Sequence, residues 1–157
     1  MKGNSNQNIN SLIEMAVKVY EDRIPFNRLL GVQVESLDLE QAVLGFKMRD
    51  DLVGNYIQEI LHGGVISAVL DATGGMLASV GILNRMIGAS KDEMAQRWGR
   101  IGTIDLRIDF LRPGRGKTFH ALSNMMRTGR KVAVTRMELH NDQNLLIAVG
   151  TGTYIVG

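Results

Sequence analysis

The segment from His62 to Gly81 constrains the fold more than any other part of the chain. It is too long for a strand, and it is apolar on nearly every side, as a helix in the middle of a core must be. It is also rich in small residues, which let a sheet wrap closely around a helix: Gly64, Ser67, Ala68, Ala72, Gly74, Gly75 and Ala78. The segment therefore predicts a buried central helix.

The same stretch has to be weighed against a membrane span, because Asp71 is the one charged residue between Gly63 and Leu83. Five glycines, one threonine, two serines and a central carboxylate suit a bilayer poorly. The first ten residues are polar and do not have the apolar core of a signal peptide. We therefore expect a soluble, cytoplasmic protein with no membrane insertion.

The first thirty residues are expected to form an N-terminal helical segment (1–30). Ser11 to Glu14 fits a capping box, and apolar residues at helical spacing follow it, so a helix is predicted over 11–23 and ends before Pro25. Residues 84–98 look like an insertion. A second possible capping box, Ser90 to Glu93, predicts a short helix over 91–98.

Six segments alternate apolar and polar residues as strands do. Two lie before the central helix, separated from it by a loop over 50–60, and four hairpin-linked strands follow it: 31–38, 41–48, 103–110, 118–127, 131–140 and 145–156. Consecutive hairpins favour an antiparallel sheet. We expect one α+β domain (1–157), in which a six-stranded antiparallel sheet wraps around one long central helix.

Composition excludes several kinds of chemistry. The chain has 157 residues, no cysteine and a formal net charge of only +2, so a thiolate nucleophile, a cysteine metal site and nucleic-acid binding are not expected. Basic residues gather around two late turns: Arg112, Arg115, Lys117, Arg127, Arg130 and Lys131. These turns are either solvated hairpin ends or a landing site for an anionic ligand such as a nucleotide phosphate.

Two features of the central segment could do chemistry. Asp71 is a carboxylate in an apolar helix, which is costly unless it is paired or functional; the alternative is a structural cap or salt bridge. His62-Gly63-Gly64 stands where the helix should begin. Unpaired N–H groups there can form an oxyanion hole, or the glycines can simply serve the turn.

Spacing limits how the two features work together. Gly63 and Asp71 are eight residues apart, about 12 Å along a helix. One copy of the helix cannot bring both to a single carbonyl group. A second subunit with an antiparallel central helix would do so, which predicts a homodimer with active sites at its interface.

Longer motifs point to a family. Asn55, Leu61-His-Gly-Gly64 and Asp71, followed by the run from Gly102 to Pro113, resemble the PaaI-type hotdog-fold acyl-CoA thioesterases. The likeness runs from about residue 31 to the end and is greatest to a YigI-like proteobacterial subgroup. It implies a hotdog fold, hydrolysis of an acyl-CoA thioester, no cofactor or metal, and pairing of dimers into a dimer of dimers.

The resemblance also implies residue roles. Asp71 would be the general base or a nucleophile, the Gly63 N–H would polarise the carbonyl, and Asn55 would orient water or substrate. Thr103 would lie near the attacking water, and His62 would shape the loop. The CoA moiety would meet Gly64, Arg112, Pro113, Gly114, Arg130 and Lys131.

One position departs from the family pattern. Relatives usually carry glycine three residues before the histidine, where this chain has Glu59. This second carboxylate either interacts with Asp71 or points to solvent, and it puts the role of Asn55 in question.

Other functions stay open at this point. A hotdog-fold dehydratase would need a proline-containing motif that we do not find. A non-catalytic acyl-CoA-binding module would keep the basic turns but not need Asp71, and a thioesterase for acyl-carrier protein suits the basic turns almost as well. Small residues on the helix, with Met94 and Trp98 in the insertion, favour a roomy tunnel and a medium- or long-chain acyl group.

Overall fold

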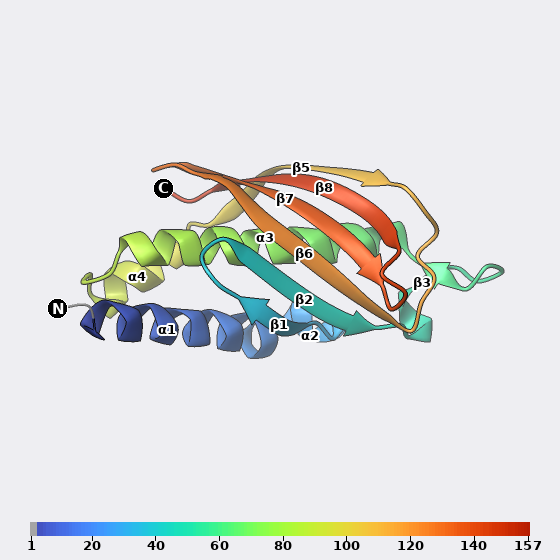
Figure 1. Ribbon diagram of the computed structural model, residues 1–157, viewed down its shortest axis with the longest axis horizontal. Coiled ribbons are helices and arrows are strands. Elements are labelled where there is room, and N and C mark those ends of the chain that lie inside the picture. Colours follow the sequence, from blue (N-terminus) through green and yellow to red (C-terminus); the bar gives the residue numbers. More distant parts are fainter. Residues whose placement is uncertain (1–2) are drawn as a thin grey trace.

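In the computed structural model, a six-stranded antiparallel sheet curls around a single long helix, α3 (Gly63–Arg85) (Figure 1). The structure describes residues 3–157, with the side chains of 9–90 and 92–157. The predicted α+β architecture with a buried central helix is confirmed. The helix is four residues longer than its apolar pattern indicated, because it continues from Gly81 to Arg85.

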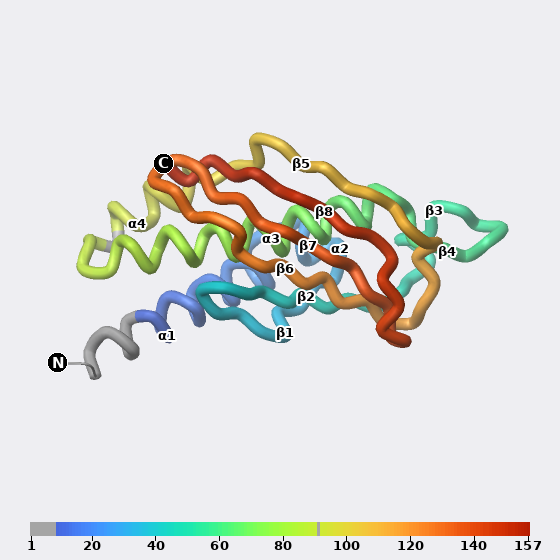
Figure 2. Tube along the Cα trace, turned by 45° about the horizontal axis from the view of Figure 1, so that its top comes forward, coloured from blue at the N-terminus to red at the C-terminus, as the bar shows by residue number. Residues whose placement is uncertain are grey.

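The strands of the sheet are ordered β1-β2-β6-β7-β8-β5. The first strand after α3, β5, therefore forms the edge of the sheet opposite β1 (Figure 2). Four consecutive hairpin-linked strands were expected after α3, but β5 pairs with β8 and not with β6. The connection between β5 and β6 packs against the start of α3, where Leu61 N donates to Gly114 O at 3.0 Å, instead of making a tight hairpin. The strands are β1 (Gln33–Leu37), β2 (Gln41–Lys47), β5 (Gly102–Phe110), β6 (Thr118–Thr128), β7 (Val132–Asn141) and β8 (Leu146–Ile155).

The N-terminal segment contains three helical elements. Helix α1 (Gly3–Lys18) continues into a π-helical turn, η1 (Val19–Arg23), and α2 (Pro25–Leu30) follows. The predicted start at Ser11 is wrong, because the helix begins eight residues earlier and Ser11 lies inside it. The predicted end before Pro25 is correct, but Pro25 also opens α2, where its fixed φ suits the first helical position.

Short elements lie at both ends of α3. The expected loop over 50–60 instead forms η2 (Asp50–Leu52) and a small hairpin of β3 (Val53–Asn55) and β4 (Ile60–Leu61), just before α3. Beyond the other end of α3 lies α4 (Lys91–Trp98), the short helix predicted from its capping box. Ser90 and Glu93 form that capping box in the structure.

Helix α3 is the core of the protein. By length and composition it could cross a membrane, but 67% of its most apolar window is buried inside the protein. Buried residues of α3 share core clusters with buried residues of the sheet: Leu70 with Phe119 and Met137, Met76 and Leu77 with Leu44, and Ala78 and Ile82 with Tyr154. Burial of this kind identifies α3 as the core helix of a folded domain.

Candidate active site

The Asp71 carboxylate lies in the first half of α3 and is held by a threonine from the sheet. The Thr103 hydroxyl donates a hydrogen bond to Asp71 Oδ1 at 2.9 Å. The Tyr154 hydroxyl, from β8, donates to the main-chain oxygen of Asp71 at 3.2 Å. Two strands thus fix the position of the carboxylate, and its second oxygen is not engaged by Thr103.

A β-bulge aims Thr103 at the helix. Simple alternation along β5 would place Ile104, Leu106 and Ile108 on one face and Thr103 on the other. The pairing with β8 shifts between Thr103 and Asp105, so Ile104 is an extra residue and is 57% exposed. Because the extra residue reverses the alternation, Thr103 shares a face with Leu106, which packs against the core.

A cavity of about 310 Å³ opens beside Asp71 and Thr103. Its remaining walls come from α2, η1, α3 and two strands and are mostly apolar or aromatic: Tyr20, Ile24, Phe26, Asn27, Ala68, Ala72, Gly75, Ile101, Gly102 and Tyr154. The π-helical turn η1 contributes Tyr20, and Ile24 follows it directly. Such turns are frequent at functional sites.

The two tyrosines of this cavity are neutral over a wide pH range. Burial, and to a lesser degree the negative charge of Asp71, raises the pKa of Tyr20 to about 12. Burial and then the charge of Asp71 raise the pKa of Tyr154 well above its ordinary value of 10.0. Both phenols are therefore available as hydrogen-bond donors near the carboxylate at neutral pH. The sequence patterns did not single out either tyrosine.

The start of α3 presents backbone N–H groups that the helix itself does not use. His62 is the N-cap, and its Nδ1 accepts the Gly64 N–H at 2.8 Å. Gly63 is the first helical residue, and an N–H at this position has no partner within its own helix. His62 thus caps the helix and uses the Gly64 N–H, whereas no hydrogen bond of the Gly63 N–H is found among the described residues.

Asn55 and Glu59 belong to the small hairpin that leads into α3. Asn55 Oδ1 accepts the N–H groups of Ile57 and Gln58, both at 3.1 Å, and so shapes the turn. Glu59 has a φ of 51°, in the left-handed region that glycine favours, and its side chain is exposed. This backbone conformation explains why glycine suits the position. Among the described side chains, Glu59 makes no contact with Asp71.

The structure separates the two basic turns that the sequence grouped together. Arg112, Pro113 and Gly114 lie by the start of α3, where a side chain at Gly114 would meet Leu61 at 2.8 Å. Arg130 and Lys131 lie beyond its end, where Arg85 binds the carbonyls of the β6–β7 turn. The helix between them is about 33 Å long. Within one chain, a single ligand cannot readily contact both turns.

The predicted residues therefore form two half-sites in each chain. One half-site contains Asp71 and Thr103 with the neighbouring cavity. The other contains Gly63, His62 and Asn55 with the Arg112 turn. The helical rise places the carboxylate and the Gly63 N–H about 12 Å apart.

A sheet curled around a helix that carries a carboxylate in its first half is the arrangement of hotdog-fold thioesterases. The chain belongs to the thioesterase superfamily, whose family model matches residues 58–148. The fold is thus the hotdog fold that the motifs indicated, and the chain is an enzyme of the thioesterase class.

Particular relatives agree with this family. The medium/long-chain acyl-CoA thioesterase YigI of Escherichia coli K12 is 48% identical over 145 residues, 92% of this chain and 94% of that protein. A crystal structure of a Shewanella oneidensis protein related to the thioesterase superfamily superposes with a TM-score of 0.89 at 41% identity, covering 95% of this chain and 97% of that one. The PaaI protein of E. coli, at 21% identity, has a TM-score of 0.70 over 98% of this chain and 93% of its own, and so shares the fold. The YigI-like and PaaI-type resemblance is confirmed.

Proposed function

We propose that the protein hydrolyses acyl-CoA thioesters to a free acid and CoA, with medium- or long-chain fatty acyl groups as substrates. The hydrogen bond between Thr103 and Asp71 Oδ1, in a cavity with apolar walls, is the observation that supports this most directly. The name of the E. coli relative supports the substrate class. The expectation of a cytoplasmic enzyme follows from this substrate class and stays a prediction.

In the proposed reaction, water attacks the thioester carbonyl and Asp71 accepts its proton. Thr103 holds Oδ1 and leaves Oδ2 free to bind the water. Negative charge develops on the carbonyl oxygen, where the Gly63 N–H and the positive end of α3 stabilise it. The C–S bond then breaks, and the CoA thiolate leaves and takes up a proton. In the variant of this scheme with a nucleophile, Oδ2 attacks the carbonyl and water hydrolyses the resulting anhydride.

The two half-sites are proposed to meet across a homodimer. Strand β5 is an edge strand, and apolar residues lie exposed on it and just beyond it: Ile104 at 57%, Phe110 at 54% and Leu111 at 48%. Tyr56 and Ile57, at the tip of the hairpin before α3, are 84% and 77% exposed. An exposed apolar edge of this kind is a template for a second copy. An antiparallel partner would place its Gly63 and Arg112 turn opposite Asp71, and a dimer of dimers remains our expectation.

The proposed chain length rests on two neighbouring cavities. Beyond the cavity at Asp71 lies a second, of about 510 Å³, with apolar walls from α1, η1 and α4: Met15, Val19, Met94, Ala95, Trp98 and Gly99. The Tyr20 ring of the first cavity meets the Trp98 ring of the second edge to face, at 6.2 Å between centroids. An acyl chain that passes these rings would reach the second cavity, which favours medium or long chains.

The test is release of free thiol from acyl-CoAs of several chain lengths, with the same acyl groups on acyl-carrier protein in parallel. Wild type is expected to release thiol from medium- and long-chain acyl-CoA. Asp71→Asn should lower kcat by roughly 10²–10⁴-fold, because it removes the base but keeps the size of the side chain. CoA binding should survive in this variant. No thiol release by wild type from any acyl-CoA would refute the proposal.

A further inference from the structure

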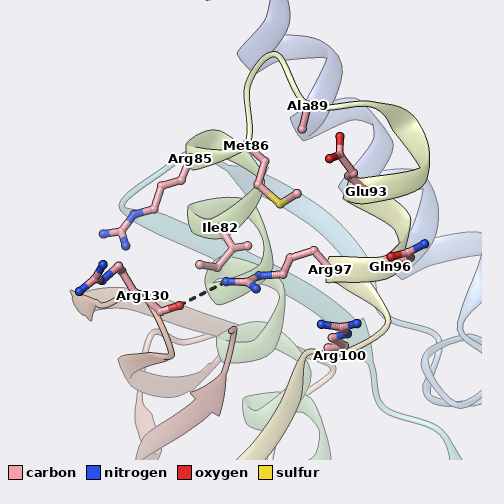
Figure 3. A pocket seen from close by; sticks show the side chains of 9 residues that line it. All are labelled: Ile82, Arg85, Met86, Ala89, Glu93, Gln96, Arg97, Arg100 and Arg130. Carbon is pink, nitrogen blue, oxygen red and sulfur yellow. Dashed lines mark hydrogen bonds between the residues drawn. The ribbon is translucent and has the colours of Figure 1, made fainter.

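Four arginines line a cavity of about 430 Å³ that lies away from Asp71, at the far end of α3 (Figure 3). Arg85 comes from the last turn of α3 and Arg97 from the last turn of α4. Arg100 lies in the connection between α4 and β5, and Arg130 lies in the turn between β6 and β7. We call these four side chains the arginine pocket. The sequence motifs named only Arg130 of this group.

The arginine pocket has a large excess of positive charge. Its one carboxylate, Glu93, accepts hydrogen bonds from Ser90 N at 2.8 Å and from Ser90 Oγ at 2.7 Å in the capping box. These bonds lower the pKa of Glu93. Among the described residues, none of the four arginines forms an ion pair. Four arginines thus line a cavity whose one carboxylate is already engaged, and a cleft lined by one sign of charge attracts ions of the other sign.

Two of the arginines are held in place by main-chain oxygens. Arg97 Nη2 donates to Arg130 O at 3.3 Å, and Arg85 Nη1 donates to Gly129 O at 2.9 Å. These bonds use part of the five donors of each guanidinium. Arg97 Nε is buried without an acceptor. The charges are therefore positioned by the fold but not neutralised by it.

The geometry points to a ligand with phosphate groups, and we propose that the arginine pocket binds a molecule that carries at least two of them. Guanidinium groups bind phosphate oxygens through paired, charge-assisted hydrogen bonds. Four guanidinium groups around one cavity carry more positive charge than its single carboxylate can neutralise. The remaining walls, with Ile82, Met86 and Ala89, offer an apolar surface on which a base or ring could rest.

Two sources of this chemistry exist, and the pocket's position suits both. Arg100 is three residues from Thr103, at most about 10 Å of extended chain, and α3 carries both Asp71 and Arg85. The phosphate groups of the CoA substrate could therefore reach the pocket while the thioester lies at Asp71; this source rests on the proposed function. A free phosphorylated molecule that binds without being hydrolysed is the other source.

Binding is tested with adenosine 3′,5′-bisphosphate, which carries phosphates like those of CoA but no thioester, by calorimetry on the full chain. Wild type is expected to bind it, and Arg100→Gln combined with Arg97→Gln should weaken binding at least roughly tenfold. If loss of Arg97 disturbs folding, Arg100→Gln alone still tests the proposal. This single variant should fold normally, because no hydrogen bond of the Arg100 side chain occurs among the described residues. Arg136→Gln, an exposed arginine on the outer face of the sheet, is the matched control and should bind like wild type.

The kinetic comparison then separates the sources. If the pocket holds the substrate, Arg100→Gln raises KM for octanoyl-CoA, but not for S-octanoyl-pantetheine, which has no phosphate. If it holds a separate molecule, bisphosphate binding falls while both KM values stay the same. Failure of wild type to bind the bisphosphate, or equal binding by wild type and the pocket variants, overturns the proposal. Absence of acyl-CoA hydrolysis would refute the proposed function, but bisphosphate binding would still decide whether the arginine pocket binds phosphate groups.

Discussion

At the scale of single residues, the hydroxyl of Thr103 and the phenols of two tyrosines define the surroundings of Asp71. The hydroxyl is a donor at 2.9 Å from one carboxylate oxygen. The tyrosines are buried and lie close enough for the charge of Asp71 to raise both of their pKa values. Each relation predicts a measurable effect of a small change.

Replacing Thr103 by valine should lower kcat/KM by roughly 10–100-fold, because a hydrogen bond to a charged group is worth about 1.5–3 kcal/mol. Thr103→Ser keeps the hydroxyl and should retain most of the activity. Steady-state kinetics on one acyl-CoA compare the three proteins. Equal loss in the serine and valine variants would mean that shape, not the hydroxyl, matters here.

Stability should fall at high pH because of the tyrosines. The folded-state pKa of Tyr20 is about 12, above the ordinary 10.0, so its contribution is complete below pH 10 and is lost as the pH rises towards 12. Tyr154 acts in the same direction. Thermal unfolding between pH 8 and 11.5 should show a declining Tm. The decline should be shallower in Tyr20→Phe, and an equally steep decline there would contradict the assignment.

At the scale of elements, α3 is shaped by how closely the sheet approaches it. A Cβ atom at Gly74 would lie 2.3 Å from Tyr154 Oη and 2.5 Å from Met137 Sδ, both fully or almost fully buried. A Cβ atom at Gly81, two turns on, would have Met125 Cε as a nearest neighbour at 3.5 Å. The first glycine is required by packing, and the second is not.

Gly74→Ala should therefore destabilise the protein by about 1–3 kcal/mol, the usual cost of overpacking a dense core. Gly81→Ala should be neutral or stabilise it by up to about 1 kcal/mol, because alanine favours the helix. Urea unfolding of the two variants, which differ from wild type by the same methyl group on the same helix, measures the difference. Comparable losses in both would show that the sheet approaches α3 equally closely at the two positions.

At the scale of the whole molecule, the site is proposed to need two chains, because Gly63 and Asp71 lie about 12 Å apart on one helix. Gly63→Pro tests the donor at the helix start with little disturbance. Proline is favourable at the first helical position, and His62 before it already has the extended φ of −64° and ψ of 135° that a following proline requires. The substitution removes the N–H and little else.

Gly63→Pro and Asp71→Asn should each be inactive alone. Unfolding the two variants, mixing them and refolding them together should restore activity. In a mixed dimer one of the two sites receives an intact Asp71 and an intact Gly63. Random pairing gives about a quarter of wild-type activity, since half of the dimers are mixed and half of their sites are intact. Gly63→Ala, which keeps the N–H, is the control and should be active alone. No recovery on mixing would place both residues of each site in one chain.

Sequence reasoning predicted the central helix, the six strands and α4 because each has a strong local signal. The residues of the two proposed half-sites came from Asp71 and His62-Gly63-Gly64 together with the family resemblance, and their roles stay predictions. Other features had no such signal. The position of β5 depends on the path of the chain around the start of α3, and α1 extends into a polar segment that resembles a tail. The distance between the Arg112 and Arg130 turns depends on which end of the sheet each occupies. Tyr154 and the arginine pocket are assembled from distant segments and are visible only in three dimensions.

The extra residue at Ile104 has a consequence for how this site can change. Pairing between β5 and β8 runs unbroken on the Phe110 side of the bulge, and Thr103 lies on its other side. Deleting Ile104 would join Thr103 directly to Asp105, so simple alternation would keep the threonine on the face of Leu106, towards α3. The deletion would thus make the ladder regular and leave the hydroxyl at Asp71, while it removes an exposed apolar side chain from the edge strand. The bulge therefore adds an outward-facing residue beside Asp71 without changing the face that Thr103 occupies.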